Sequence, residues 1–93
     1  MSINDIKSII QQIAEEYSIT KVLLFGSRAD GSNREDSDID LIIEFNGPVT
    51  LMGLARLRNH IEELTGLETD VIHGPIRETD MIEVGKVVEL YVA

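Results

Sequence analysis

The chain has 93 residues, which fits a single domain spanning 1–93. Its formal net charge of −9, from 8 Lys and Arg against 17 Asp and Glu, argues against a general role on nucleic acid, because phosphate backbones bind clustered cations. The absence of Cys excludes disulfides and thiolate metal sites and fits the cytoplasm, and no apolar run approaches the length of a membrane span.

The first half of the chain predicts one helix and two strands. Apolar residues recur at helical spacing from Ser2 to Tyr17, and Ser2 can cap that helix. The β-branched run 20–25 ends at a glycine and predicts a strand. Segment 27–37 is rich in Gly, Ser, Asn and Asp, which predicts a loop that could open with one helical turn. The run 38–45 predicts the second strand.

The second half predicts a longer helix and a further strand. Residues 50–66 start with a Thr cap, carry apolar residues on one face and end at a glycine, so we expect a helix. Residues 67–74 predict a third strand, 77–85 a short third helix, and 86–93 either a final strand or a loose helical turn. This order of elements predicts an α/β (α+β) domain, with a small mixed β-sheet packed with helices.

Two aspartates stand where the second strand begins. Successive side chains of a strand point to opposite faces, so Asp38 and Asp40 should share one face, about 6.7 Å apart along the backbone. Two such carboxylates repel unless a cation lies between them, and Mg²⁺ prefers oxygen ligands. The pair therefore predicts a metal site for a phosphorylated substrate. A second metal would need a third acid, for which Asp70 is the candidate and Glu68 the alternative on the same strand face.

The turn before the acid pair is suited to binding phosphate. Gly26 and Ser27 directly follow a predicted strand. Glycine lets the backbone come close to a ligand, and free N–H groups at the start of a helical turn attract anions. Ser27 adds a hydroxyl donor, and Gly31 permits a second tight bend. We therefore expect a phosphate held at this turn to be bridged by metal to the acids.

The motif GSRADG followed by SDIDL resembles the signature of the DNA polymerase β-like nucleotidyltransferase superfamily. The length resembles its minimal nucleotidyltransferase (MNT) branch, whose members often serve as antitoxins beside a HEPN-domain ribonuclease toxin. The resemblance implies a polymerase-β-like core in which Gly26, Ser27 and Arg28 bind the nucleotide. It also implies that the acid pair binds two Mg²⁺ ions, and that Asp70 completes the catalytic metal and helps to deprotonate the attacking hydroxyl.

The same resemblance implies an activity and a partner. Relatives transfer a nucleoside monophosphate from ATP or another NTP to a hydroxyl, and the antitoxins transfer AMP to a tyrosine of their toxin. An acidic chain suits a basic partner such as an RNA-cleaving toxin, and we expect no direct contact with nucleic acid or membrane. Two alternatives stay open: an antitoxin that acts by binding with a vestigial site, or the catalytic subunit of a two-chain transferase that modifies a small molecule or a nucleic acid end.

One position departs from the family pattern. The residue before Gly31 is frequently basic in such relatives, and here it is Asp30. Arg28 and Arg34 could supply the missing charge. Arg56 and Arg58, on the second predicted helix, are expected on a solvated face, and the sequence leaves open whether they meet nucleotide or partner.

Overall fold

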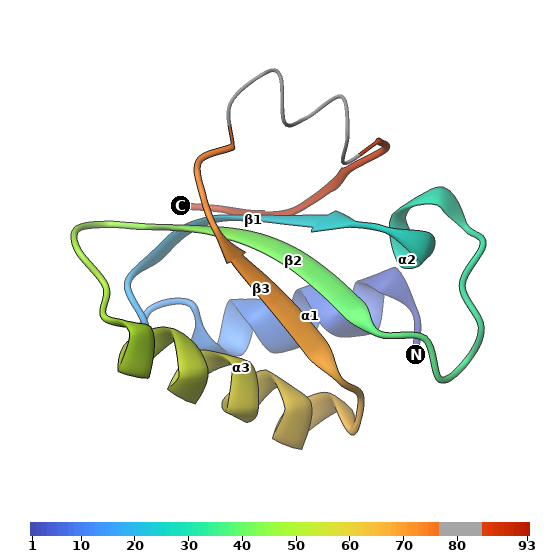
Figure 1. Cartoon of the computed structure of the whole chain (residues 1–93), viewed down its shortest axis with the longest axis horizontal. Helices are drawn as coiled ribbons and strands as arrows, with labels where there is room; N and C mark the ends of the chain where they lie inside the picture. Colours follow the sequence, from blue (N-terminus) through green and yellow to red (C-terminus); the bar gives the residue numbers. More distant parts are fainter. Residues whose placement is uncertain (77–84) are drawn as a thin grey trace.

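The computed structural model describes residues 1–76 and 85–93 of the chain. The short helix expected at 77–85 falls almost entirely outside these ranges. Within them the chain forms helices and strands in this order (Figure 1): α1 (Ile3–Ile13), β1 (Ile19–Phe25), α2 (Ser27–Asp30), β2 (Ile39–Phe45), α3 (Leu51–Thr65), β3 (Thr69–His73) and β4 (Val88–Val92).

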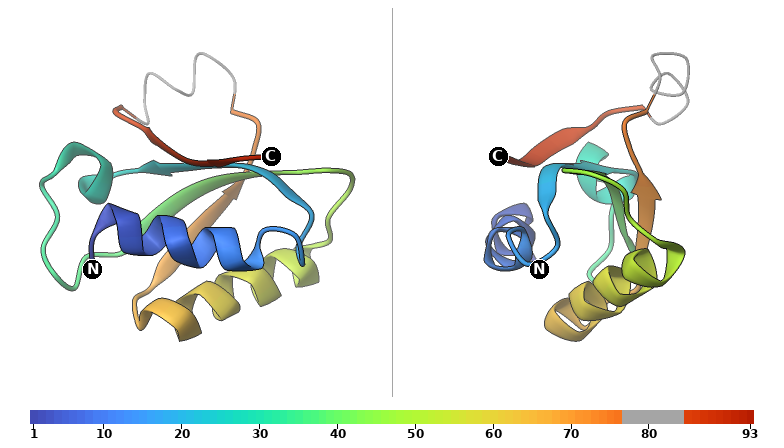
Figure 2. Two further views of the ribbon diagram at one scale, coloured as in Figure 1. Left: turned by 180° about the vertical axis from the view of Figure 1, so that it is seen from behind. Right: turned by 90° about the vertical axis from the view of Figure 1, so that its left-hand side faces the viewer.

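The strands form one mixed sheet in the order β3-β2-β1-β4. Strand β1 is antiparallel to both β2 and β4, whereas β2 and β3 are parallel. The long helices α1 and α3 cover one face of the sheet, as the two views of Figure 2 show. The expected mixed sheet packed with helices is thus confirmed, and the open question at 86–93 is resolved in favour of a strand.

The first helix is capped as the sequence predicts but ends earlier. Ser2 and Asp5 form a reciprocal pair, in which each backbone N–H donates to the other's side chain at 2.9 and 3.1 Å. The helix ends at Ile13 rather than at Tyr17. Tyr17 instead lies in a turn, where its hydroxyl is 2.9 Å from Nδ1 of His60 on α3. The prediction of a helix to Tyr17 is wrong: residues 14–18 form turns, in which the N–H of Ile19 donates to the Ala14 carbonyl at 2.9 Å and Ser18 has a positive φ of 54°.

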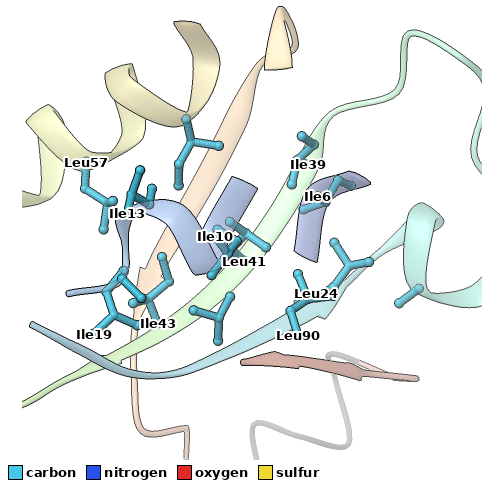
Figure 3. Packing of buried hydrophobic residues seen from close by; sticks show 14 residues of the cluster. Ile6, Ile10, Ile13, Ile19, Leu24, Ile39, Leu41, Ile43, Leu57 and Leu90 are labelled. Carbon is cyan, nitrogen blue, oxygen red and sulfur yellow. The ribbon is translucent and has the colours of Figure 1, made fainter. Parts of the chain in front are cut away.

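The hydrophobic core lies between the sheet and the two long helices, and Figure 3 shows its packing. Alternate residues of β2 point into it, and Ile39, Leu41 and Ile43 are all fully buried. The residues between them therefore face the other side of the sheet. The other labelled members come from the helices and the neighbouring strands: Ile6, Ile10, Ile13, Ile19, Leu24, Leu57 and Leu90.

Candidate active site

The acid pair lies on the sheet face opposite the helices. Asp40 is on β2 and half-buried, whereas Asp38 stands one residue before the strand and is exposed. Because Ile39 and Leu41 are fully buried in the core, alternation places the two aspartates on the other face, as the sequence predicts. The start of β2, the start of β3 and the end of β1 meet at the same end of the sheet (Figure 1).

The third acid comes from the parallel neighbour. In the register of β2 and β3, Asp70 lies directly opposite Asp40. Glu68, the alternative, lies before β3; its carbonyl accepts the N–H of Ile39 at 2.9 Å, and its side chain is exposed. The register thus places Asp70 opposite Asp40, whereas Glu68 lies outside the strand.

The electrostatics of the three acids are unfavourable without a cation. Burial raises the pKa of the Asp40 carboxyl, and the charges of Asp70 and then Asp38 raise that pKa further, as does a side-chain hydrogen bond with Asp70. Among the described residues, no three Asp, Glu, His or Cys side chains are grouped so that they could hold a metal ion as they stand. The three aspartates nevertheless fit a hard divalent cation, because such cations prefer carboxylate oxygens and because the carboxylates repel one another when no cation is bound.

Gly26 lies against the central acid. Phe25 pairs with Asp40 in the antiparallel register of β1 and β2, which brings the next residue beside that carboxyl group. Gly26 has φ +75° and ψ −155°, a backbone conformation that is essentially restricted to glycine. A Cβ there would lie 3.2 Å from Cγ of Asp40 and closer still to Oδ2. The sequence therefore needs glycine at this position for two separate reasons.

The helical turn after Gly26 leaves backbone donors at its start. The N–H groups of Ala29 and Asp30 both donate to the Gly26 carbonyl, at 3.0 and 3.2 Å. Helix geometry gives the N–H groups before them, those of Ser27 and Arg28, no acceptor within the helix. These two donors follow directly on the glycine that touches Asp40. The expected single helical turn is confirmed as α2.

Arg28 has a different environment from the one expected of a nucleotide ligand. Its side chain is 4% exposed, and its guanidinium donates to the main-chain carbonyls of Met1, Glu35 and Ser37. The guanidinium therefore binds main-chain carbonyls of the protein itself. No pattern in the sequence signals this role, because every residue has a main-chain carbonyl and composition does not show which of them a distant side chain reaches.

The other charged residues named in the sequence, Asp30 and three arginines, lie on the surface. Asp30 accepts hydrogen bonds from the N–H and hydroxyl of Ser32, at 2.9 and 2.6 Å, and these bonds lower the pKa of its carboxyl. An acid two residues before Ser, with Gly between, is typical of such a turn. Arg34 is exposed in the loop before Asp38. Arg56 and Arg58 are exposed on α3, which packs on the sheet face away from Asp40.

No helix within residues 1–76 or 85–93 combines the length and apolar character needed to cross a bilayer. The half-buried and exposed acids instead form a polar site at one end of the sheet. A glycine that begins a helical turn, set against Asp40 and its neighbours Asp38 and Asp70, fits a site for phosphoryl or nucleotidyl transfer.

Comparison with known proteins identifies the family. Residues 6–89 match the family model of the nucleotidyltransferase domain, so the chain belongs to the nucleotidyltransferase family. A relative from Methanocaldococcus jannaschii, named "putative protein adenylyltransferase", is 39% identical over 72 residues, which are 77% of each chain. The sequence resemblance to the minimal nucleotidyltransferases is thereby confirmed, and the protein is an enzyme of the nucleotidyltransferase class.

Solved structures share the fold at low sequence identity. A chain of a toxin–antitoxin complex with AMP-PNP aligns with a TM-score of 0.77 at 15% identity, over 94% of this chain and 73% of the other. A chain of a complex between the tri-AMPylated HEPN toxin of Shewanella oneidensis and its MNT antitoxin aligns with a TM-score of 0.72 at 13% identity, over 98% and 73%. At these identities the likeness establishes the fold.

Proposed function

We propose that the protein transfers AMP from ATP to a hydroxyl, most simply a tyrosine, of a HEPN ribonuclease toxin and so acts as its antitoxin. The observation that carries the proposal is the pairing of Asp40 with Asp70 across β2 and β3, with Gly26 against Asp40. Named relatives support this particular reaction, because they include a protein adenylyltransferase and a complex that holds an AMPylated HEPN toxin.

The residues of the site have distinct tasks in this reaction. The turn at Gly26 and Ser27 would hold the triphosphate through main-chain N–H groups and the serine hydroxyl. Asp38 and Asp40 would hold two Mg²⁺ ions and Asp70 one of them; when bound, these ions supply positive charge beside the triphosphate and the attacking hydroxyl. Without them, burial and then the charges of Asp70 and Asp38 raise the pKa of the Asp40 carboxyl.

The proposed transfer of AMP makes one bond and breaks one. The acceptor oxygen forms a bond to the α-phosphorus of ATP, the bond from that phosphorus to the bridging oxygen of the β-phosphate breaks, and pyrophosphate leaves with that electron pair. The hydroxyl proton passes to a carboxylate oxygen of Asp70, which is exposed and therefore within reach of a large acceptor. The protein's part is to fix the two reactants in line and to accept the proton.

The proposed partner is supported by charge as well as by relatives. The net charge of −9 favours association with a basic protein, and a ribonuclease must carry positive charge to bind RNA. Asp38 and Asp70 are both exposed, so the acid end of the sheet is accessible to a macromolecule. These features favour a protein acceptor over direct contact with nucleic acid.

Intact-mass spectrometry of the protein encoded beside this chain, which the proposal expects to be a HEPN toxin, tests the proposal. That protein is incubated with this chain, ATP and Mg²⁺, and the same reaction is run with Asp70→Asn and, as a matched control, Glu68→Gln. We expect a mass gain of one or more AMP groups with the native chain and with Glu68→Gln, none with Asp70→Asn, and peptide mapping to a tyrosine. A stable complex without any mass gain would contradict the proposal and favour an antitoxin that acts by binding.

A further inference from the structure

The side chain of Arg28 links the two halves of the site. Its Nε and Nη2 both donate to the Ser37 carbonyl, at 3.2 and 3.0 Å. Nη2 also donates to the Glu35 carbonyl at 3.1 Å, and Nη1 to the Met1 carbonyl at 3.1 Å. Arg28 is 4% exposed, and a buried guanidinium is stable only when its donors are satisfied. Here the acceptors are main-chain oxygens of two separate segments.

The most important of these acceptors is the Ser37 carbonyl, because it belongs to the peptide bond that leads into Asp38. Two donors of one rigid fork bind this single oxygen, so they fix both its position and its direction. Arg28 itself is the second residue after Gly26. One side chain therefore joins the start of α2 to the residue before the exposed acid.

The loop that carries Asp38 has few other ties to the fold. Its remaining bonds are local: the N–H of Arg34 donates to the Ser37 hydroxyl at 2.7 Å, and the N–H of Ser37 to the Arg34 carbonyl at 3.1 Å. The residue after Asp38, Ile39, is anchored in the core and bonded to Glu68. Asp38 thus lies between an anchored strand and a loop that the Arg28 side chain ties to α2 through the carbonyls of Glu35 and Ser37.

We infer that Arg28 is a positioning residue, which sets the placement of Asp38 relative to the Gly26–Ser27 turn without touching nucleotide through its side chain. This inference rests on the proposed function for its catalytic consequence, and on the hydrogen bonds alone for its structural one. Replacement of Arg28 should free the backbone of Asp38 and weaken metal binding, because one of the three acids would be ordered only when the metal arrives. The affinity for ATP itself should change little.

The test compares Arg28→Met, which removes every donor, and Arg28→Lys, which keeps the charge but lacks the fork, with Arg58→Met on the far side of the sheet. Backbone order parameters from ¹⁵N relaxation are measured first. We expect the value at Asp38 to fall from about 0.85 to below about 0.6 in Arg28→Met, with an intermediate value in Arg28→Lys, while Leu41 stays rigid in all variants. Arg58→Met should match the native chain.

Metal binding and turnover are measured on the same proteins. Paramagnetic broadening of the Asp40 and Asp70 signals by Mn²⁺ should need about tenfold more Mn²⁺ in Arg28→Met. In the AMP-transfer assay kcat should fall about 10- to 100-fold, because a misplacement of about 1 Å can cost that much, while KM for ATP stays within about twofold. If Arg28→Met shows no cooperative unfolding transition and so is not folded, the comparison is made with Arg28→Lys.

The outcomes separate this inference from the proposed function. An unchanged order parameter at Asp38 and unchanged Mn²⁺ binding, together with a raised KM for ATP, would overturn the inference and make Arg28 a nucleotide ligand. Arg28→Lys behaving like the native chain in every measurement would also overturn it. The relaxation and Mn²⁺ measurements need no catalysis, so a native chain that transfers no AMP would count against the proposed function and leave these two results decisive.

Discussion

Replacement of Gly26 by Ala should damage the site more than it damages the fold. The backbone at Gly26, with φ +75° and ψ −155°, lies in a region that costs a residue with a side chain about 1–3 kcal/mol. For a chain of this size each kcal/mol lowers the melting temperature by roughly 4–8 °C, so a cost of about 2 kcal/mol predicts a fall of about 8–16 °C. The added Cβ would in addition displace the Asp40 carboxylate, which it meets directly.

Gly31→Ala provides the matched control. Gly31 has φ +85° and ψ 3°, which costs alanine about 1–2 kcal/mol, but a Cβ there meets nothing within 4 Å. Below both melting temperatures, Gly26→Ala should reduce AMP transfer by about 100-fold or more, whereas Gly31→Ala should keep it within a few-fold. Melting is followed by circular dichroism and transfer by mass spectrometry. Equal activity of the two variants would refute the claim that the glycine makes room for Asp40.

Three further changes probe the charges and the packing. Asp40→Asn should abolish AMP transfer yet stabilise the metal-free fold at pH 7. Folding raises the pKa of Asp40, so its ionisation costs stability above about pH 4. The stability gained by the substitution should therefore vanish in thermal melts below about pH 3. Asp70→Asn should lower the pKa of Asp40 toward its ordinary value, as read from ¹³C carboxyl shifts; an unchanged pKa would mean that burial and Asp38 cause the shift without Asp70. Tyr17→Phe should cost about 0.5–1.5 kcal/mol in urea unfolding through its lost bond to His60 and leave transfer unchanged, so slower transfer would reveal coupling to the site.

The sequence predicts most of the fold because its local signals are strong. The Thr50 cap and the apolar spacing locate α3, and the β-branched runs locate three strands. The early end of α1 could not be predicted, because apolar spacing continues to Tyr17, whereas the chain turns at Ser18, which is not a glycine although its φ is 54°. The parallel pairing of β2 with β3 is likewise a property of the whole sheet, and local patterns do not contain it.

The candidate site was predictable to the extent that it follows strand alternation. Asp38 and Asp40 share a face because period two leaves no other arrangement once Ile39 enters the core. The choice between Asp70 and Glu68 required the register, since both have the same parity. The role of Arg28 could be recognised only in the three-dimensional structure. A charged residue beside a phosphate-binding motif suggests a ligand, whereas here the guanidinium binds main-chain carbonyls.

The cost of the acid site should couple the stability of this protein to its substrate. A domain of this size has a small margin of stability, and Asp40, half-buried beside like charges, reduces that margin in the metal-free state. A metal–nucleotide complex that binds only the folded chain would add about RT ln(1 + [L]/Kd), roughly 2.7 kcal/mol at a hundredfold excess over Kd, and would also remove the repulsion. Mg²⁺ with ATP should therefore raise the melting temperature of the native chain well above that of Asp40→Asn, reversing their order in metal-free buffer. The order of the two melting temperatures reverses only if the Asp40 carboxylate, which destabilises the metal-free protein, also binds the metal.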